Sequence, residues 1–214
     1  MNQMRAGLAI SVVVSFSYLL VKGNIKDELK YVLICVLASF VHTSMLTAIP
    51  VVILNHVRLS KKWIYCSVLL SFFVSATFSK QIMDFISQSD IIRDMATDYV
   101  DKQGNNDKAY AADLTNPMIY YQCLILFIYT FLEKKIVPLS RYYYVFRNGY
   151  FLSTIVLIVL CQYAVLSARV STIFATFEIF MIPMIFKALP KPINVAAYLA
   201  LLLPLVVFFV YNMH

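Results

Sequence analysis

The chain has 214 residues, of which 61% are hydrophobic and only 14% are charged, and its mean hydropathy is +0.77. A soluble domain of this length would need far more polar surface, so a soluble globular fold is excluded and the excess apolar surface must face lipid. The net charge of +7 would suggest a nucleic-acid partner in a soluble protein. Here the Lys and Arg residues stand in short clusters between apolar runs, as in loops that set membrane topology. We therefore expect a membrane protein with no nucleic-acid partner.

Apolar runs alternate with short polar stretches along the whole chain. A helix that crosses a bilayer needs ~20 apolar residues, and several of these runs are at the short end of that range. We predict an all-α polytopic transmembrane helix bundle of about six to eight helical segments, forming a single transmembrane domain over residues 1–214. The seven apolar runs are 6–21, 31–54, 63–78, 118–132, 150–166, 172–186 and 193–211.

The run at 31–54 allows two interpretations. As one crossing, kinked near Pro50, it divides the 18 Lys and Arg residues almost evenly between the two sides of the membrane, 10 against 8. As a re-entrant pair of half-length helices that turns at His42, it gives a division of 12 against 6. The positive-inside rule favours the second arrangement, in which the turn at membrane depth is buried in protein or lines a wet cavity.

The stretch 79–117 is the one soluble-looking part of the sequence and is predicted to be an extracytoplasmic loop that starts with a short amphipathic helix. Tyr99, within this loop, is a candidate for stacking on a sugar ring, although a local packing role is the alternative. By contrast, the tyrosines that flank Arg141 and Arg147 are expected to form an interfacial aromatic belt. These are Tyr142, Tyr143, Tyr144 and Tyr150.

Four ionisable side chains stand within apolar runs or at their ends, where a charge is costly and marks a candidate functional site. They are Arg5, His42, Arg169 and Glu178. Each has a structural alternative that the sequence leaves open. Glu178 would be a protonated acid bonded to a neighbouring helix or the partner of an arginine, and His42 a satisfied interior histidine. Arg169 would extend to the headgroups, and Arg5 would be a flanking charge.

Arg169 and Glu178 are nine residues apart, which on a continuous helix places them half a turn out of phase and ~13 Å apart along the axis. They cannot pair within one helix. If both serve one site, we expect that Arg169 precedes the helix or that the site lies beyond its end.

Three stretches carry a resemblance to a known family. Residues 4–9, Met4-Arg5-Ala6-Gly7-Leu8-Ala9, resemble that family's Arg-led entry into a helix. Residues 37–44, which contain Ala38-Ser39 and His42, are similar to its A-S-x-x-H-x-S segment. Ala168-Arg169, followed by Phe174, Glu178 and Pro183, resembles its closing A-R-x-x-x-x-F…E…P stretch. In this order and spacing the chain resembles the C-terminal half of the EpsG-type polysaccharide polymerases, relatives of the Wzy O-antigen polymerases.

The resemblance implies a glycosyltransferase-type enzyme of the bacterial inner membrane that joins oligosaccharide repeat units carried on undecaprenyl diphosphate. Arg169 and Arg5 would then bind the lipid diphosphate, because guanidinium groups neutralise the charge that develops on this leaving group. Glu178 or His42 would deprotonate the acceptor hydroxyl. No Asp-x-Asp pair or His/Cys cluster is present in the sequence, so no metal and no other cofactor is predicted.

Members of that family usually carry several more spans before the Arg-led segment, so the chain is expected to be a partial or truncated form. Two other functions remain open: a transporter or flippase for the lipid-linked glycan, with interior charges along its path, and a non-catalytic membrane subunit of a polysaccharide assembly machine. The expected partners are the lipid bilayer, the lipid-linked glycan, and a chain-length regulator or other assembly proteins.

Overall fold

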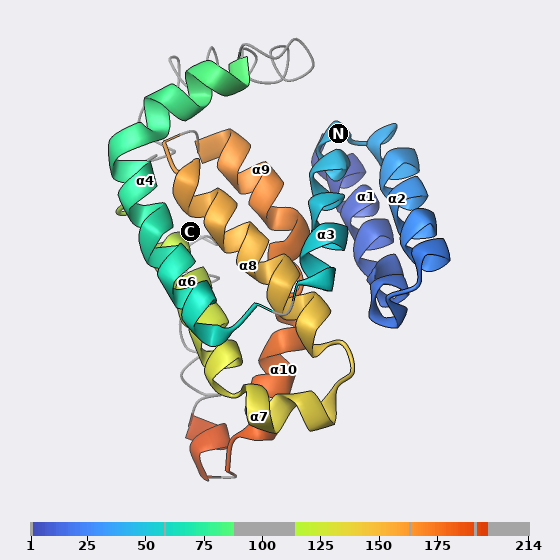
Figure 1. The fold of residues 1–214 in the computed structure, drawn as a ribbon, viewed down its shortest axis with the longest axis vertical. Coiled ribbons are helices and arrows are strands. Elements are labelled where there is room, and N and C mark those ends of the chain that lie inside the picture. The colour runs from blue at the N-terminus through green and yellow to red at the C-terminus, as the bar shows by residue number, and fades with distance from the viewer. Residues whose placement is uncertain (1, 58, 88–113, 163, 191, 197–214) are drawn as a thin grey trace, which may run out of the picture.

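The computed structural model describes residues 2–57, 59–87, 114–162, 164–190 and 192–196, and within these ranges all the regular structure is helical (Figure 1). The predicted all-α class is confirmed for this part of the chain. The elements are α1 (Asn2–Ser15), η1 (Phe16–Lys22), α2 (Ile25–Ser39), η2 (Thr43–Ala48), α3 (Pro50–His56), α4 (Lys61–Ser87), α6 (Pro117–Phe131), α7 (Glu133–Ile136), η3 (Val137–Leu139), α8 (Tyr143–Val159), α9 (Ala164–Ala175) and α10 (Glu178–Ala188).

The segment 31–54 forms two helical halves that reverse direction. The start of α2 lies beside the end of α3, because His56 Nε2 is 2.9 Å from Glu28 Oε1. Asn55 Nδ2 also donates to the carbonyl of Leu20, just before α2, at 2.6 Å. Both basic loops that flank this segment therefore lie at one end of the hairpin, and the turn at His42 lies at the other. The geometry matches the arrangement of two half-length helices and not the single kinked helix.

Polar side chains explain why the helix stops at this turn. Hydroxyl groups near the break bond to the backbone of their own helix, which competes with regular helix propagation: Ser39 Oγ donates to the carbonyl of Val36 at 2.7 Å, and Thr47 Oγ1 donates to that of Ser44 at 2.6 Å. Pro50 follows at the first position of α3, where its missing N–H costs little. The returning half of the hairpin is therefore built from a 3₁₀ segment and a short α-helix.

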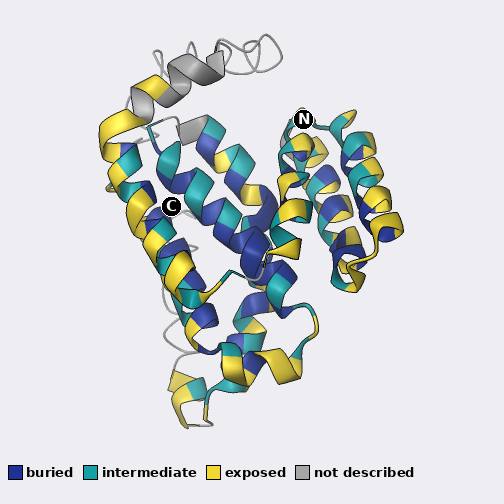
Figure 2. Ribbon diagram, in the orientation of Figure 1, coloured by how far each residue is buried: buried dark blue, intermediate teal, exposed yellow. Residues whose placement is uncertain are grey.

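Helix α8 is the central element of the fold. It packs against α3, α4, α6 and α9, and most of its residues are buried (Figure 2). Gly149 permits the close approach of the α9–α10 junction, because a Cβ at this position would lie 2.5 Å from Phe177 Cε2. The side chains of α8 therefore position the helices that surround it, including the α2–α3 hairpin.

By length and hydropathy, one helix among the described residues is able to cross a bilayer by itself, Met4–Lys22 with a mean hydropathy of 1.8. Leu166–Ala175 and Glu178–Ala188 pass the same test together, although they are bent by 49° at a short break. Three further apolar helices, Thr43–His56, Pro117–Phe131 and Tyr143–Val159, are shorter, with 10–17 residues. The helical character of the predicted bundle is thus confirmed for the described residues, while its number of crossings stays a prediction.

The predicted loop at 79–117 begins within a helix, since α4 continues through Ser87. Residues 88–113, including Tyr99, lie outside the described residues, as does most of the apolar run at 193–211.

Candidate functional site

The turn between α2 and η2 places His42 between two helix ends. The backbone N–H groups of Val41 and His42 both donate to the carbonyl of Ala38 at 3.0 Å, which closes α2. The backbone of His42 is extended, with φ −153° and ψ 111°, and its carbonyl accepts from the N–H of Met45 at 3.0 Å to start the next helix. The first N–H groups of a helix have no acceptor within it and carry partial positive charge. The turn therefore combines an imidazole with a helix N-terminus.

Helix α9, which carries Arg169, packs against η2, and His42 is the residue that directly precedes η2. The positive charge of Arg169 reaches the His42 imidazole. A neutral imidazole can accept a proton, so this part of the fold combines a candidate base with a guanidinium group.

Arg5 is exposed near the start of α1. Only Gly23 and Asn24 separate η1 from α2, and Gly23 adopts the left-handed conformation, with φ 58°, that allows this tight turn. Because α1 and α2 therefore run in opposite directions, the start of α1 lies at the same end of the molecule as the His42 turn (Figure 1). Arg5 shares this end with His42.

Glu178 occupies a different environment. It begins α10 immediately after the break that follows α9, and its Oε1 accepts a hydrogen bond from Tyr150 Oη of α8 at 2.5 Å. The Tyr121 hydroxyl of α6 also lies within hydrogen-bonding reach of the carboxyl group. Arg169 lies inside α9, so it does not precede the helix. The structure packs α9, which carries Arg169, on η2, which follows His42, and places Glu178 near tyrosines of two other helices.

Glu178 also faces a cavity of about 640 Å³. The lining residues come from α10 and from Asn194, and Lys187 contributes the other charged group. Ile179, Ile182, Pro183 and Phe186 complete this mostly apolar wall. The carboxyl group is therefore accessible from one side while its oxygen is held by Tyr150.

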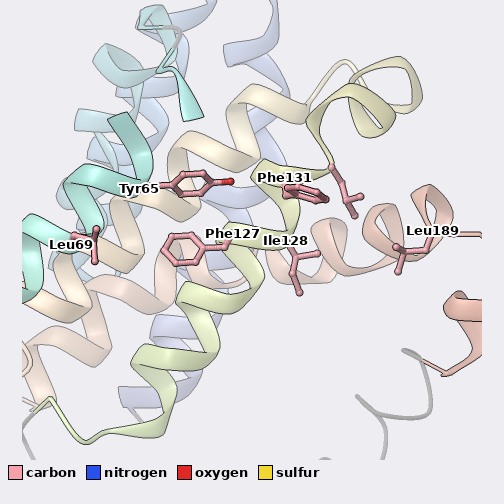
Figure 3. A pocket seen from close by; sticks show the side chains of 7 residues that line it. Tyr65, Leu69, Phe127, Ile128, Phe131 and Leu189 are labelled. Carbon is pink, nitrogen blue, oxygen red and sulfur yellow. The ribbon is translucent and has the colours of Figure 1, made fainter. Parts of the chain in front are cut away.

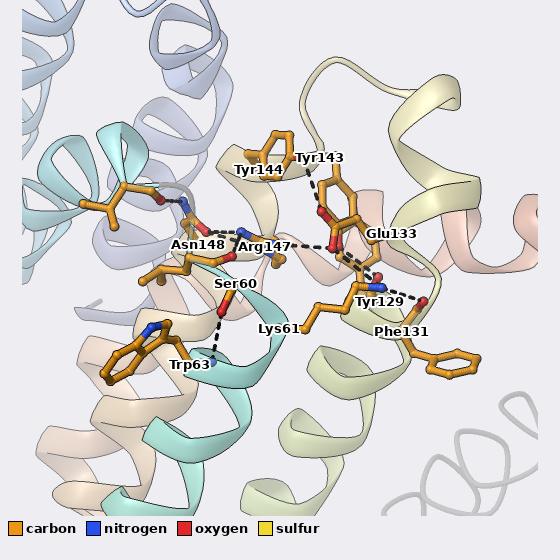
Figure 4. Close-up of polar contacts among 12 residues, drawn as sticks. Ser60, Lys61, Trp63, Tyr129, Phe131, Glu133, Tyr143, Tyr144, Arg147 and Asn148 are labelled. Atoms are coloured by element: carbon orange, nitrogen blue, oxygen red, sulfur yellow. Dashed lines mark hydrogen bonds and ion pairs between the residues drawn. The ribbon is translucent and has the colours of Figure 1, made fainter.

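Arg147 is the most deeply buried charged residue in the described part of the chain, at 1% exposure (Figure 4). Its Nη2 donates to the carbonyl of Leu59 at 2.8 Å, and its Nη1 lies 3.7 Å from Glu133 Oε2. Lys61 Nζ is 3.7 Å from the same carboxylate oxygen, and the guanidinium carbon lies 5.0 Å from the centre of the Tyr144 ring. This network joins the start of α4 and the start of α7 to α8.

The neighbouring Asn148 holds the returning half of the hairpin. Its Nδ2 donates to the carbonyls of Leu54 at 2.8 Å and Val57 at 3.4 Å, at the end of α3. These carbonyls stand at the C-terminus of α3, where the regular helical donors run out; each also accepts a backbone N–H, Leu54 from Val57 and Val57 from Leu59. Asn148 therefore anchors α3 to α8 and indirectly positions the His42 turn.

The sequence did not predict this network. Arg147 was expected in a basic loop and its tyrosine neighbours in an interfacial belt, yet Tyr143 and Tyr150 are only 1% and 0% exposed, so the belt is wrong for these two residues. No sequence signal pointed to this helix, because Asn148-Gly149, between Arg147 and the apolar run at 150–166, is a pair typical of a turn. In the structure α8 passes through both residues.

The His42 turn is suited to bind an anion and to move a proton. A helix N-terminus and a guanidinium group both attract phosphate oxygens, and a neutral imidazole is a general base. Among the residues that the structure describes, no three His, Cys, Asp or Glu side chains come together as metal ligands.

A family model described as the EpsG family matches residues 1–214. The match includes all three stretches that carry the sequence resemblance, so this resemblance is confirmed along the chain. No curated protein and no solved structure matches the sequence.

Proposed function

Because the chain belongs to the EpsG family, we propose that it is a polysaccharide polymerase of the bacterial inner membrane. Its substrates are oligosaccharide repeat units carried on undecaprenyl diphosphate, which it joins into O-antigen, capsule or exopolysaccharide. The observation that carries this proposal is the packing of α9, which carries Arg169, against η2, which directly follows His42 in the α2–α3 hairpin. Arg169 would supply the cation that binds the leaving group, and His42 the base that deprotonates the acceptor.

The chemistry follows from these two side chains. A hydroxyl group of the acceptor glycan attacks the anomeric carbon of the donor unit, and the bond from that carbon to the diphosphate oxygen breaks. The lipid diphosphate leaves with the electron pair, and Arg169 together with the N–H groups at the start of η2 neutralises its charge. His42 takes the proton of the attacking hydroxyl. The attacking hydroxyl group and the departing diphosphate would thus each be served by a group at this turn.

Arg5 and Glu178 have supporting roles in this proposal. Arg5, at the same end of the molecule as His42, supplies a second guanidinium group to the diphosphate. Glu178 is a positioning residue, since its bond with Tyr150 ties the start of α10 to α8 and so fixes the end of α9, which carries Arg169. Tyr99 is proposed to contact a sugar ring from the extracytoplasmic loop.

The hairpin also supports the proposed topology. It places the basic cluster at Lys22–Lys30 and the cluster at Lys61–Lys62 at one end, which the positive-inside rule assigns to the cytoplasm. The His42 turn then opens towards the outer leaflet. A multi-pass protein with this orientation meets lipid-linked repeat units after they have crossed the membrane.

Complementation of a bacterial strain that lacks its polymerase tests this function. Arg169→Ala and His42→Ala should leave single repeat units in place of long chains, whereas Arg141→Ala, which changes an exposed arginine near the start of α8, should restore normal chains. Membrane levels of each variant are compared by immunoblotting. Normal chain length with Arg169→Ala would reject the proposal. Accumulation of repeat units on the cytoplasmic face would indicate a flippase. If the unmodified protein neither restores long chains nor causes such accumulation, it would be a non-catalytic subunit.

A further inference from the structure

An apolar groove lies between α4 and α6 (Figure 3), close to the start of α4, where Lys61 bonds to the backbone of Phe131. Its volume is about 700 Å³, within the range of about 300–1,000 Å³ that is common for ligand sites. The side chains that line it are almost entirely apolar and include Tyr65, Leu69, Phe127, Ile128, Phe131 and Leu189. Leu69 and Phe131 are 69% and 75% exposed, so the groove is open to its surroundings.

Basic residues surround one end of this groove. Lys61 Nζ donates to the carbonyl of Phe131 at 3.2 Å, which holds its ammonium group at the groove wall. Lys62 and the exposed pair Lys134 and Lys135 stand at the adjoining starts of α4 and α7, and Lys187 precedes Leu189 by two residues.

The nearby carboxylate does not neutralise this cluster. Glu133 already faces Lys61 and Arg147 at 3.7 Å each and accepts a hydrogen bond from Tyr144 at 3.3 Å. The apolar groove therefore has an excess of positive charge at one end.

We propose that this groove binds an anionic phospholipid of the cytoplasmic leaflet, with an acyl chain between α4 and α6 and the phosphate group among the lysines. Basic residues beside grooves between membrane helices recognise anionic headgroups through charge, while the apolar wall holds the chain. A zwitterionic lipid would add a choline cation near the same lysines and would bind more weakly. This site is separate from the His42 turn and does not depend on polymerase activity.

Native mass spectrometry of the purified protein in detergent tests the site with added phosphatidylglycerol and phosphatidylcholine. The protein should retain phosphatidylglycerol about tenfold better, as expected for a phosphate group near two or more lysines. Leu69→Trp fills the groove and should abolish this retention. Leu70→Trp is the matched control, because Leu70 is the next residue of α4, is 60% exposed and does not line the groove.

A second pair of variants tests the charge. Lys134→Gln with Lys135→Gln should remove most of the preference for phosphatidylglycerol, whereas Lys22→Gln with Lys26→Gln, at the end of η1 and the start of α2, should keep it. Equal retention of both lipids, retention of neither, or equal loss in Leu69→Trp and Leu70→Trp would overturn the proposal. The charge variants retain the groove wall, so they decide the outcome even if Leu69→Trp fails to fold.

Discussion

His56 Nε2 lies 2.9 Å from Glu28 Oε1, although 28 residues separate the two along the chain. The contact joins the end of α3 to the start of α2. Since a helix pair can close in this way only when the chain reverses between them, the turn at His42 must lie at the far end of the hairpin. The position of the proposed catalytic base therefore follows from a contact at the opposite end of the same segment.

Labelling of single cysteines tests this reversal in cells. Lys26→Cys and Lys62→Cys, each in a background without the four native cysteines, should react with a membrane-impermeant maleimide from the same side of the membrane, because the hairpin places both basic clusters at one end. Thr43→Cys, at the turn, is the control and should not react from that side. Labelling of positions 26 and 62 from opposite sides would show that 31–54 is a single crossing.

Arg147→Leu should destabilise the protein by about 3 kcal/mol, because it removes a fully buried guanidinium group that donates to the half-buried Leu59 carbonyl and is one of the two cations facing Glu133. The measurement is the free energy of unfolding in detergent. Arg141→Leu removes an exposed arginine from the same region and should change this energy by less than about 0.5 kcal/mol. Equal stability of the two variants would mean that the Arg147 network does not hold α4, α7 and α8 together.

Gly149→Ala should destabilise the fold by about 2 kcal/mol, since the added methyl group would meet the buried rings of Phe174 and Phe177. Gly7→Ala is the matched control on α1, where nothing lies within 4 Å of the added Cβ and the higher helix propensity of alanine should raise stability slightly. Thermal unfolding of both variants decides the comparison. A stabilising effect at position 149 would contradict the close packing of α8 on the α9–α10 junction.

The hairpin could be predicted from the sequence, whereas the contacts that hold it against α8 could not. The polar residues at His42-Thr43-Ser44 interrupt an apolar run, and the count of basic residues favours a reversal there, so two local signals agreed. From the sequence, Arg147 looked only like a basic residue in a loop, because the carbonyl that it binds, that of Leu59, is 88 residues away. A sequence pattern cannot show that such a pair meets.

The candidate site divides in the same way. His42 and Arg169 were selected because charge is costly inside apolar runs, and the structure packs α9, which carries Arg169, on η2, which follows His42. Glu178 was selected by the same argument, but its partners Tyr121 and Tyr150 come from helices that only the fold places beside it. The energetic cost of a charge inside an apolar run identifies candidate site residues in the sequence, whereas the packing of the helices decides which of these residues meet.

The most direct test of the account is the rate of polymer formation by the purified protein in lipid vesicles that contain lipid-linked repeat units. Arg169→Ala and His42→Ala should each lower this rate by about 10²–10³-fold, and the double variant should be little slower than either single one, because both groups serve one step. Full activity of either single variant, or losses in the double variant that simply multiply, would show that Arg169 and His42 do not form one catalytic site.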